Sequence, residues 1–230
     1  MSSVFDCRDE SQVLTGMREA RRTIARGELV VVPTDTVYGV AADAFNPAAV
    51  ARLLAAKGRG RQAPPPVLVA GTSTLRALVS EVPEPVDRLI EAAWPGGLTI
   101  ILPAQPSLAW DLGETGGTVA VRMPAHRIVL ELLEETGPLA VSSANLTGRP
   151  AATTAPQAAS QLGDSVTVYL DDGPSGSEAA STILDATALT RGGSGRARIL
   201  REGVVGRLVL REVLGDLLEP DPAGTPDEAA

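Results

Sequence analysis

The stretch LVVVPTDTVYG, residues 29–39, decides the fold class of this sequence. Its first part, Leu29 to Val32, is a run of apolar and mostly β-branched residues, which is typical of a strand that is buried on both faces. The amphipathic pattern of Val13 to Arg26 comes directly before it and predicts a helix. Helices that alternate with buried strands are typical of α/β proteins, so we expect this class.

Helical and strand patterns alternate through the rest of the chain. Asn46 is a typical helix N-cap and Pro47 suits the first turn, so a helix is predicted to run from there to Lys57, where Gly58 ends it. Further strands are expected at residues 67–69, 98–102, 118–123, 139–142, 166–170, 182–184 and 198–200, and further helices at 86–93, 128–135 and 155–162. This order predicts a single domain over residues 1–211, built as one open, twisted mixed sheet with flanking helices.

The last part of the sequence, residues 212–230, is predicted to form a separate acidic tail. It contains six acidic residues, no basic residue and three prolines, so we expect it to be flexible. The body before it has 20 basic and 22 acidic residues, a net charge of −2 out of the −8 of the whole chain. Such a body argues against whole-surface binding to nucleic acid by charge alone.

The composition excludes several classes of protein. Of the 230 residues, 44% are hydrophobic and 21% are charged, which fits neither a disordered nor a fibrous chain. The apolar stretches are far shorter than the roughly 20 residues of a membrane span, and the acidic N-terminus does not resemble a secretory signal. One cysteine, Cys7, and one histidine, His126, allow no internal disulfide and argue against a zinc site. We therefore expect a cytoplasmic protein without a membrane anchor or a structural metal.

Polar residues gather at the ends of predicted strands, where ligands bind in α/β sheets. The first group lies in the segment from Pro33 to Gly39, in which Thr34, Asp35 and Thr36 supply two hydroxyls and a carboxylate. This segment can bind a ligand, or it can be a turn that satisfies its own backbone.

The second group consists of Lys57, Arg59 and Arg61, three cations within five residues. A lysine point charge beside two guanidinium groups suits an anion with several oxygens, such as a polyphosphate. Lys57, the only lysine in the chain, can alternatively stabilise the end of its helix, but Arg59 and Arg61 lie beyond the last helical turn.

Two further groups belong to later strands. The alternation of the strand at 118–123 places Thr118 and Arg122 on one face, where Arg122 can meet a carboxylate or form a structural ion pair. The segment from Ser142 to Gly148 is rich in hydroxyl and amide groups, although it is also an ordinary turn signal. The sequence contains no phosphate-binding loop, no dinucleotide fingerprint and no serine-hydrolase elbow. Together, the four groups predict a pocket for a phosphorylated ligand.

These segments resemble the YrdC family, the threonylcarbamoyl-adenylate synthases of tRNA modification. The matching stretches follow the family's order and span about residues 13–205. They are PTDTVYGV at 33–40, AAKGRGR at 55–61, WPGGLTIIL at 94–102, TVAVRMPAH at 118–126, SSANLTGRP at 142–150, STILD at 181–185 and ILREG at 199–203.

The resemblance implies both an activity and a fold. The family joins L-threonine, bicarbonate and ATP into threonylcarbamoyl-AMP and pyrophosphate, with Mg²⁺ accompanying ATP. A separate transferase complex then moves the threonylcarbamoyl group to a tRNA adenosine, so direct contact with tRNA is conceivable. The implied fold is an open, twisted α/β sheet around a basic concave cavity, in the short single-domain form.

The resemblance also implies roles for ten residues. The residues expected at ATP are Lys57, Arg59, Thr118, Ser143, Asn145 and Arg201. The residues expected at threonine are Thr36, Arg122, Val141 through its backbone, and Ser181. We expect no protein nucleophile, because charge neutralisation and alignment can carry an attack of an anionic carbamate on an α-phosphate.

Two departures from the family pattern affect the site. Many relatives have Asp-Asn after the K-x-R motif and a His after the next strand, whereas this chain has Gln62 to Pro66 and then Ala70-Gly71. A polar contact is therefore missing or supplied by another residue. Two other functions stay open: a non-catalytic RNA-binding module, and a carbamoyl-adenylate enzyme with another acceptor.

Overall fold

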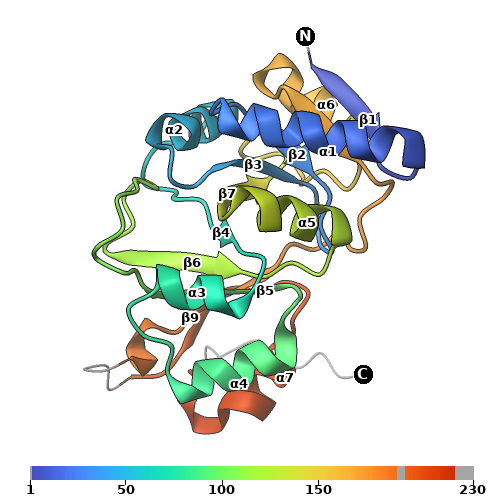
Figure 1. Cartoon of the computed structure of the whole chain (residues 1–230). Coiled ribbons are helices and arrows are strands. Elements are labelled where there is room, and N and C mark those ends of the chain that lie inside the picture. The colour runs from blue at the N-terminus through green and yellow to red at the C-terminus, as the bar shows by residue number, and fades with distance from the viewer. Residues whose placement is uncertain (1, 191–194, 221–230) are drawn as a thin grey trace, which may run out of the picture.

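Ten strands form one continuous mixed sheet in the computed structural model, which describes residues 2–190 and 195–220 (Figure 1). They are β1 (Ser3–Asp6), β2 (Val30–Val32), β3 (Gly39–Asp43), β4 (Val67–Leu68), β5 (Leu98–Pro103), β6 (Thr118–Arg122), β7 (Leu139–Ser143), β8 (Val168–Asp171), β9 (Thr182–Asp185) and β10 (Arg198–Arg201). Their order across the sheet is β1-β8-β2-β3-β7-β4-β6-β5-β9-β10. The sheet combines parallel pairs such as β5–β9 with antiparallel pairs such as β5–β6. The predicted open, mixed α/β sheet is thus confirmed.

Seven α-helices flank the sheet within the described part of the chain. They are α1 (Glu10–Ala25), α2 (Pro47–Ala56), α3 (Thr72–Leu78), α4 (Glu84–Ala93), α5 (Arg127–Thr136), α6 (Ala155–Leu162) and α7 (Arg207–Leu214). As predicted, Asn46 caps α2, because its side-chain oxygen accepts from the backbone N–H groups of Ala48 and Ala49. No helix among the described residues has the length and apolar character that crossing a membrane requires.

The half of the sheet around β2 is covered by helices on both faces. Val30 and Val32 belong to the hydrophobic cluster that includes α1 and α5, whereas Val31 belongs to the cluster that includes α2 and α6. All three valines are fully buried. Successive side chains of a strand point to opposite faces, so covering both faces requires an unbroken apolar run.

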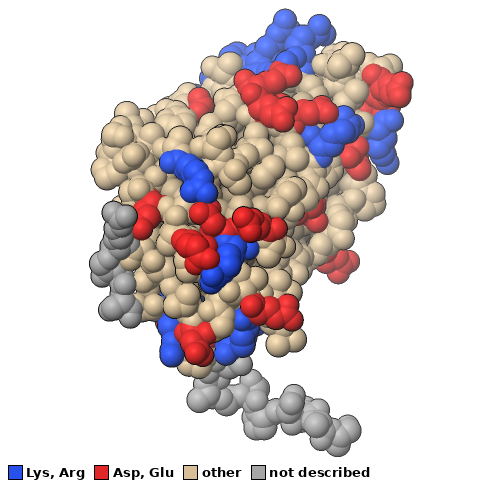
Figure 2. Space-filling view, turned by 60° about the horizontal axis from the view of Figure 1, so that its bottom comes forward, with Lys and Arg blue, Asp and Glu red and all other residues tan. Residues whose placement is uncertain are grey.

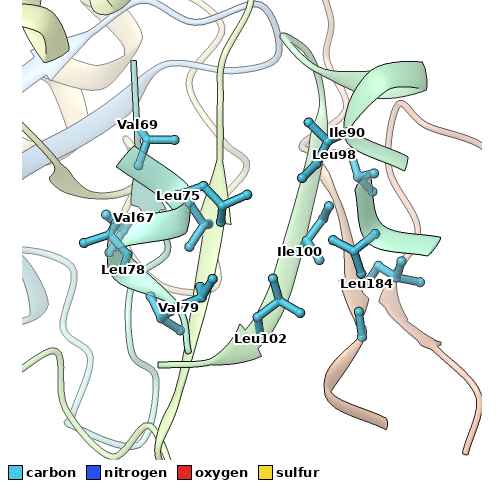
Figure 3. Close-up of a cluster of buried hydrophobic side chains, with 14 of the residues drawn as sticks. Val67, Val69, Leu75, Leu78, Val79, Ile90, Leu98, Ile100, Leu102 and Leu184 are labelled. Carbon is cyan, nitrogen blue, oxygen red and sulfur yellow. The ribbon is translucent and has the colours of Figure 1, made fainter. Parts of the chain in front are cut away.

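The other half of the sheet, formed by β5, β6 and β9, is covered by helices on one face only. Leu98, Ile100 and Leu102 of β5 pack into a cluster with α3, α4 and α7, and Figure 3 shows Leu98 beside Ile90 of α4. The residues between them point to the opposite face. This uncovered face forms one wall of the cavity described below.

Four elements escaped the sequence-based prediction: β1, β3, α3 and α7. The sequence of β3, Gly-Val-Ala-Ala-Asp, is poor in residues that favour strands. It is nevertheless a central strand, because antiparallel pairing with both β2 and β7 supplies its hydrogen bonds. Tertiary pairing therefore outweighs local preference there.

The predicted boundary at residue 212 falls inside α7. Leu214 and Leu218 are buried in the same cluster as α4, and the N–H of Glu219 donates to the carbonyl of Ala197. The prediction of a flexible tail is thus wrong for residues 212–220, where apolar leucines alternate with the acids and bury against the body. The remainder of that predicted tail, 221–230, lies outside the described residues.

Candidate functional site

A cavity of about 310 Å³ lies against the uncovered face of β5, β6 and β9. The loop between β2 and β3, the end of β7 and the segment after α2 form its other walls. Side chains of alternate strand positions line it, including Thr99 and Ile101 of β5 and Thr118, Ala120 and Arg122 of β6. Val121 of the same strand packs into the hydrophobic cluster on the other face, as the predicted alternation requires, and Val119 belongs to that cluster while also bordering the cavity.

Eight of the ten residues predicted at the site line this cavity. They are Thr36, Arg59, Thr118, Arg122, Val141, Ser143, Ser181 and Arg201. The other two, Lys57 and Asn145, are buried outside the lining. Residues that are up to 165 positions apart in the sequence, from Thr36 to Arg201, thus line one cavity, as the resemblance implied.

The charged residues that line the cavity are all arginines: Arg59, Arg122 and Arg201. None of the described lining residues is an aspartate or a glutamate. The predicted basic character of the cavity is therefore confirmed, although the molecule as a whole has a net charge of −8. A basic, partly enclosed hollow attracts anionic ligands.

Arg122 is held from three sides. Its side chain is 7% exposed, its Nε donates to the carbonyl of Gly96 at 2.8 Å, and its Nη1 donates to Thr36 Oγ1 at 2.9 Å. Its Nη2 donates to Asp35 Oδ1 at 2.7 Å, which forms a mostly buried ion pair. Burial lowers the pKa of Arg122, and the adjacent carboxylate of Asp35 opposes that effect.

The loop that carries Asp35 both satisfies its own backbone as a turn and presents a side chain to the cavity, the two alternatives that the sequence left open. Thr34 Oγ1 donates to the carbonyl of Val37 at 2.6 Å and accepts from the N–H of Thr36, so Thr34 stabilises the turn. Its only hydroxyl hydrogen is used there, so the 3.1 Å bond to Thr36 requires Thr36 as the donor. Thr36 Oγ1 therefore faces the cavity as an acceptor, and one of its lone pairs already takes the Arg122 hydrogen.

Gly39 lets the strands β3 and β7 pack closely together at the cavity wall. A side-chain Cβ at Gly39 would lie 2.5 Å from Cγ1 of Val141, which is far inside van der Waals contact. The absence of a side chain at Gly39 thus lets Val141 pack against β3 at the cavity wall.

Arg201 and Arg59 are the other two arginines that line the cavity. Arg201 donates from Nε and Nη2 to the carbonyl of Ser181 and from Nη2 to Ser181 Oγ at 3.1 Å. Arg59 donates to Thr147 Oγ1 at 3.1 Å and to Ser142 Oγ at 3.3 Å. Partial burial and the nearby charge of Arg59 lower the pKa of Arg201. Within the described residues, neither arginine is paired with a carboxylate.

Lys57 lies beneath the loop that follows β7. Its side chain is 1% exposed, and its ammonium donates to the carbonyl of Ser143, to the carbonyl of Asn145 at 2.7 Å and to Asn145 Oδ1 at 3.4 Å. Burial, and secondly the charge of Arg59, lower the pKa of Lys57 to about 7. All three ammonium hydrogens have acceptors in this loop, so Lys57 supports the segment that presents Ser143 to the cavity.

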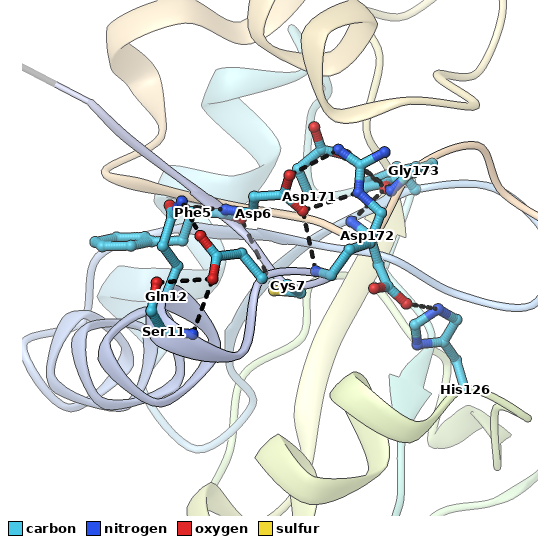
Figure 4. Close-up of polar contacts among 12 residues, drawn as sticks. Phe5, Asp6, Cys7, Ser11, Gln12, His126, Asp171, Asp172 and Gly173 are labelled. Atoms are coloured by element: carbon cyan, nitrogen blue, oxygen red, sulfur yellow. Dashed lines mark hydrogen bonds and ion pairs between the residues drawn. The ribbon is translucent and has the colours of Figure 1, made fainter.

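His126, the only histidine, does not line the cavity. Its Nε2 lies 3.3 Å from Asp172 Oδ2, and its buried Nδ1 has no hydrogen-bond partner among the described residues (Figure 4). Burial lowers its pKa, although Asp172 opposes this effect. No group of three or more His, Cys, Asp or Glu residues in the described part of the chain is arranged to hold a metal ion.

Sequence reasoning missed parts of the lining. Pro64, Pro65 and Pro66 form an apolar part of the cavity wall. Thr99 also lines the cavity, and its hydroxyl lies 2.9 Å from Ser181 Oγ. The alternation of β5 could have identified Thr99, because it stands between the core residues Leu98 and Ile100.

Comparisons with known proteins agree with this geometry. A family model described as "Telomere recombination", named for Sua5, YciO and YrdC, matches residues 22–203. A Mycobacterium tuberculosis protein, provisionally named a threonylcarbamoyl-AMP synthase, is 51% identical over 94% of this chain and 96% of its own length. The Bacillus subtilis threonylcarbamoyl-AMP synthase is 39% identical over 86% of this chain and 59% of its own length.

A solved structure extends the comparison to three dimensions. Pyrococcus abyssi Sua5, crystallised in complex with L-threonine, superposes with a TM-score of 0.85 at 32% identity. The match covers 94% of this chain and 62% of the Pyrococcus chain, so this chain spans about three fifths of that protein. On the family model, these identities and the shared fold, the chain belongs to the Sua5/YciO/YrdC family.

Proposed function

We propose that this protein is an L-threonylcarbamoyladenylate synthase, which forms threonylcarbamoyl-AMP and pyrophosphate from L-threonine, bicarbonate and ATP for the modification of tRNA. The observation that carries the proposal is the cavity with three arginines and no lining carboxylate, in which one arginine is fixed and two are unpaired within the described residues. The names of the relatives support it, since proteins 51% and 39% identical to this chain are named for this activity.

The unpaired end of the cavity suits ATP. Arg59 and Arg201 can donate to phosphate oxygens, and the hydroxyl of Ser143 can donate to a further oxygen. Thr118 lines the same region, but its hydroxyl hydrogen is donated to the carbonyl of Thr115 at 2.8 Å, so its oxygen can only accept. Lys57 and Asn145 would act from beneath by holding the loop of Ser143. ATP would enter as its Mg²⁺ complex, with the ion held mainly by the phosphates; the hydroxyl-rich wall offers the hard oxygen donors that Mg²⁺ accepts. When bound, the ion neutralises phosphate charge.

The fixed end of the cavity suits L-threonine. Arg122 can donate two N–H groups to the carboxylate of the amino acid, and Thr36 can accept a hydrogen from its amine or hydroxyl group. Ser181, which also accepts from Arg201, and the backbone of Val141 line the cavity and can make further contacts with the amino acid. The printed description of the Pyrococcus structure, a complex with L-threonine, supports the assignment of threonine as substrate.

The reaction requires two anions to meet. A carbamate oxygen of the threonine derivative forms a bond to the α-phosphorus of ATP, while the bond from that phosphorus to the bridging oxygen breaks and pyrophosphate leaves. Repulsion between the two anions opposes this step. Guanidinium groups fixed on both sides of the reacting atoms reduce that repulsion and align the reactants, so the step needs no protein nucleophile.

The decisive experiment measures pyrophosphate release by the purified protein with ATP and Mg²⁺, with threonine and bicarbonate each present or omitted. Prompt chromatography should show a labile adenylate. We expect release only when both co-substrates are present. Release without threonine would instead indicate a carbamoyl-adenylate enzyme with another acceptor.

A non-catalytic RNA-binding module is the competing function. On the face of the molecule shown in Figure 2, basic and acidic side chains are interspersed and form no large patch of one sign. This mixture disfavours binding of a nucleic-acid backbone to that face. ATP binding without pyrophosphate release in any combination would favour the binding role. Handover of the adenylate to a transferase complex, contact with tRNA and a cytoplasmic location stay predictions.

A further inference from the structure

The guanidinium of Arg122 has few hydrogens left for a ligand. Of its five N–H groups, three are used within the protein, by the carbonyl of Gly96, by Thr36 Oγ1 and by Asp35 Oδ1. One hydrogen remains on each Nη nitrogen. A carboxylate that binds in bidentate fashion takes two such hydrogens, so the orientation of the guanidinium decides whether this contact can form.

Asp35 controls that orientation from outside the cavity. Its carboxylate does not belong to the lining, and its Oδ1 accepts both from Arg122 Nη2 at 2.7 Å and from the backbone N–H of Ala125 at 2.9 Å. The second bond ties the carboxylate to the backbone just after β6, the strand that carries Arg122. The backbone next to Arg122 therefore fixes the position of the carboxylate that in turn orients Arg122.

Asp35 also balances charge. Arg122 is mostly buried and lies near enough to Arg201 for the two charges to repel each other. Among the described residues, the carboxylate of Asp35 is the partner that compensates the charge of the Arg122 guanidinium. Without it, repulsion and burial would favour a movement of the Arg122 side chain toward solvent.

We infer that Asp35 is a positioning residue for the amino-acid substrate, because it holds the Arg122 guanidinium so that two N–H groups face the substrate carboxylate. This inference rests on the proposed function and extends it to a residue that does not touch the substrate. Asp35 acts through Arg122, so its loss should weaken recognition of the carboxylate and leave the ATP end intact.

Two substitutions separate geometry from charge. Asp35→Ala removes the acceptor and the charge, whereas Asp35→Asn keeps an oxygen that can accept both hydrogen bonds and removes only the charge. The matched control is Asp87→Asn. Asp87 also pairs with an arginine, Arg76 at 2.5 Å, but this pair lies on α3 and α4, away from the cavity.

The test is calorimetric binding of L-threonine, of L-threonine methyl ester and of ATP to the full chain. For Asp35→Ala we expect the Kd for L-threonine to rise about 10- to 100-fold, with the Kd for ATP within about twofold of wild type. The methyl ester, which lacks the carboxylate, should bind equally to wild type and variant. Asp35→Asn should show a rise of at least about threefold, and Asp87→Asn none.

The outcomes separate the inference from the proposed function. An unchanged Kd for L-threonine in a folded Asp35→Ala, or an equal loss for threonine and its ester, would overturn the positioning role. Should Asp35→Ala fail to fold, an unchanged Kd in Asp35→Asn would overturn the role of the charge. Wild-type protein that binds ATP and shows no affinity for L-threonine would overturn the proposed function, and the inference with it.

Discussion

The paired arginine and the two unpaired arginines of the cavity are held in opposite ways. Arg122 is almost fully buried, bonded to three groups of the protein and paired with a carboxylate. Arg59 and Arg201 are bonded only to hydroxyl and carbonyl oxygens, and no described residue neutralises them. The same side chain is therefore a rigid, charge-compensated fork at one end and an uncompensated cation at the other.

This difference indicates which anion suits each end. A guanidinium that is already paired loses little by binding a single carboxylate, and its fixed orientation supplies geometric specificity. Two unpaired cations that repel each other are stabilised best by a ligand with several negative charges, such as a polyphosphate. The following predictions test that division, beginning with the largest expected effect.

Removing an unpaired cation should have the largest effect. We expect Arg59→Ala to lower kcat/KM for ATP by about 100-fold or more, because charge-assisted bonds to phosphate contribute about 1.5–3 kcal/mol each and no neighbouring residue replaces them. Steady-state kinetics of pyrophosphate release would measure this loss. Arg61→Ala is the matched control, since Arg61 stands in the same loop but pairs with Asp111 outside the cavity. Equal losses in both variants would contradict the special role of Arg59.

Removing the paired cation should affect only one substrate. We expect Arg122→Ala to raise the KM for L-threonine about 10- to 100-fold while ATP binding is retained, because the fixed fork serves the carboxylate alone. Arg122→Lys should not restore affinity, since an ammonium cannot form the bidentate contact. Kinetics with varied threonine and calorimetry with ATP would separate the two effects. A comparable loss of ATP affinity would show that the two ends are not distinct.

The buried ammonium of Lys57 should make stability depend on pH. Its pKa is lowered to about 7 in the folded protein, so between pH 7 and 10.5 the unfolded chain binds more protons at this group than the folded chain. The free energy of unfolding should therefore rise with pH in this window, by at most about 1.4 kcal/mol per pH unit, and the full penalty should apply below pH 7. Urea unfolding at pH 7, 8 and 9 would measure the slope.

Lys57→Met is the comparison for that slope, because methionine fills a similar volume without a charge. The wild type should gain stability relative to this variant as the pH rises. Parallel pH profiles for the two proteins would mean that the ammonium of Lys57 is not destabilised by burial.

The smallest effect is expected for an arginine that is paired but exposed. Arg61 and Asp111 form an ion pair of 2.8 Å with side chains that are 59% and 41% exposed. A double-mutant cycle of Arg61→Ala and Asp111→Ala in denaturant unfolding should give a coupling energy close to the error of the measurement, and salt should decrease it further. A clearly measurable coupling that persists in salt would show that pairing alone, without burial, fixes a guanidinium in this protein.

The sequence by itself determined the local features of this protein. Local patterns of a few residues predict three features: the buried strand before Pro33, the helix cap at Asn46, and the shared strand face of Thr118 and Arg122. The family resemblance, carried by these motifs, also identified eight of the residues that line the cavity. These signals are readable because side-chain direction in a helix or strand depends on near neighbours.

Only the tertiary structure decided which charges are paired. Asp35 meets Arg122 across 87 positions of the chain, and Lys57 meets Asn145 across 88. The helix and strand patterns of a sequence concern neighbouring residues and do not indicate contacts over such separations. The sequence therefore could not show that Asp35 binds an arginine or that Lys57 lies beneath the cavity. The same holds for β3 and α7, whose weak local patterns become ordered through pairing and burial against distant elements.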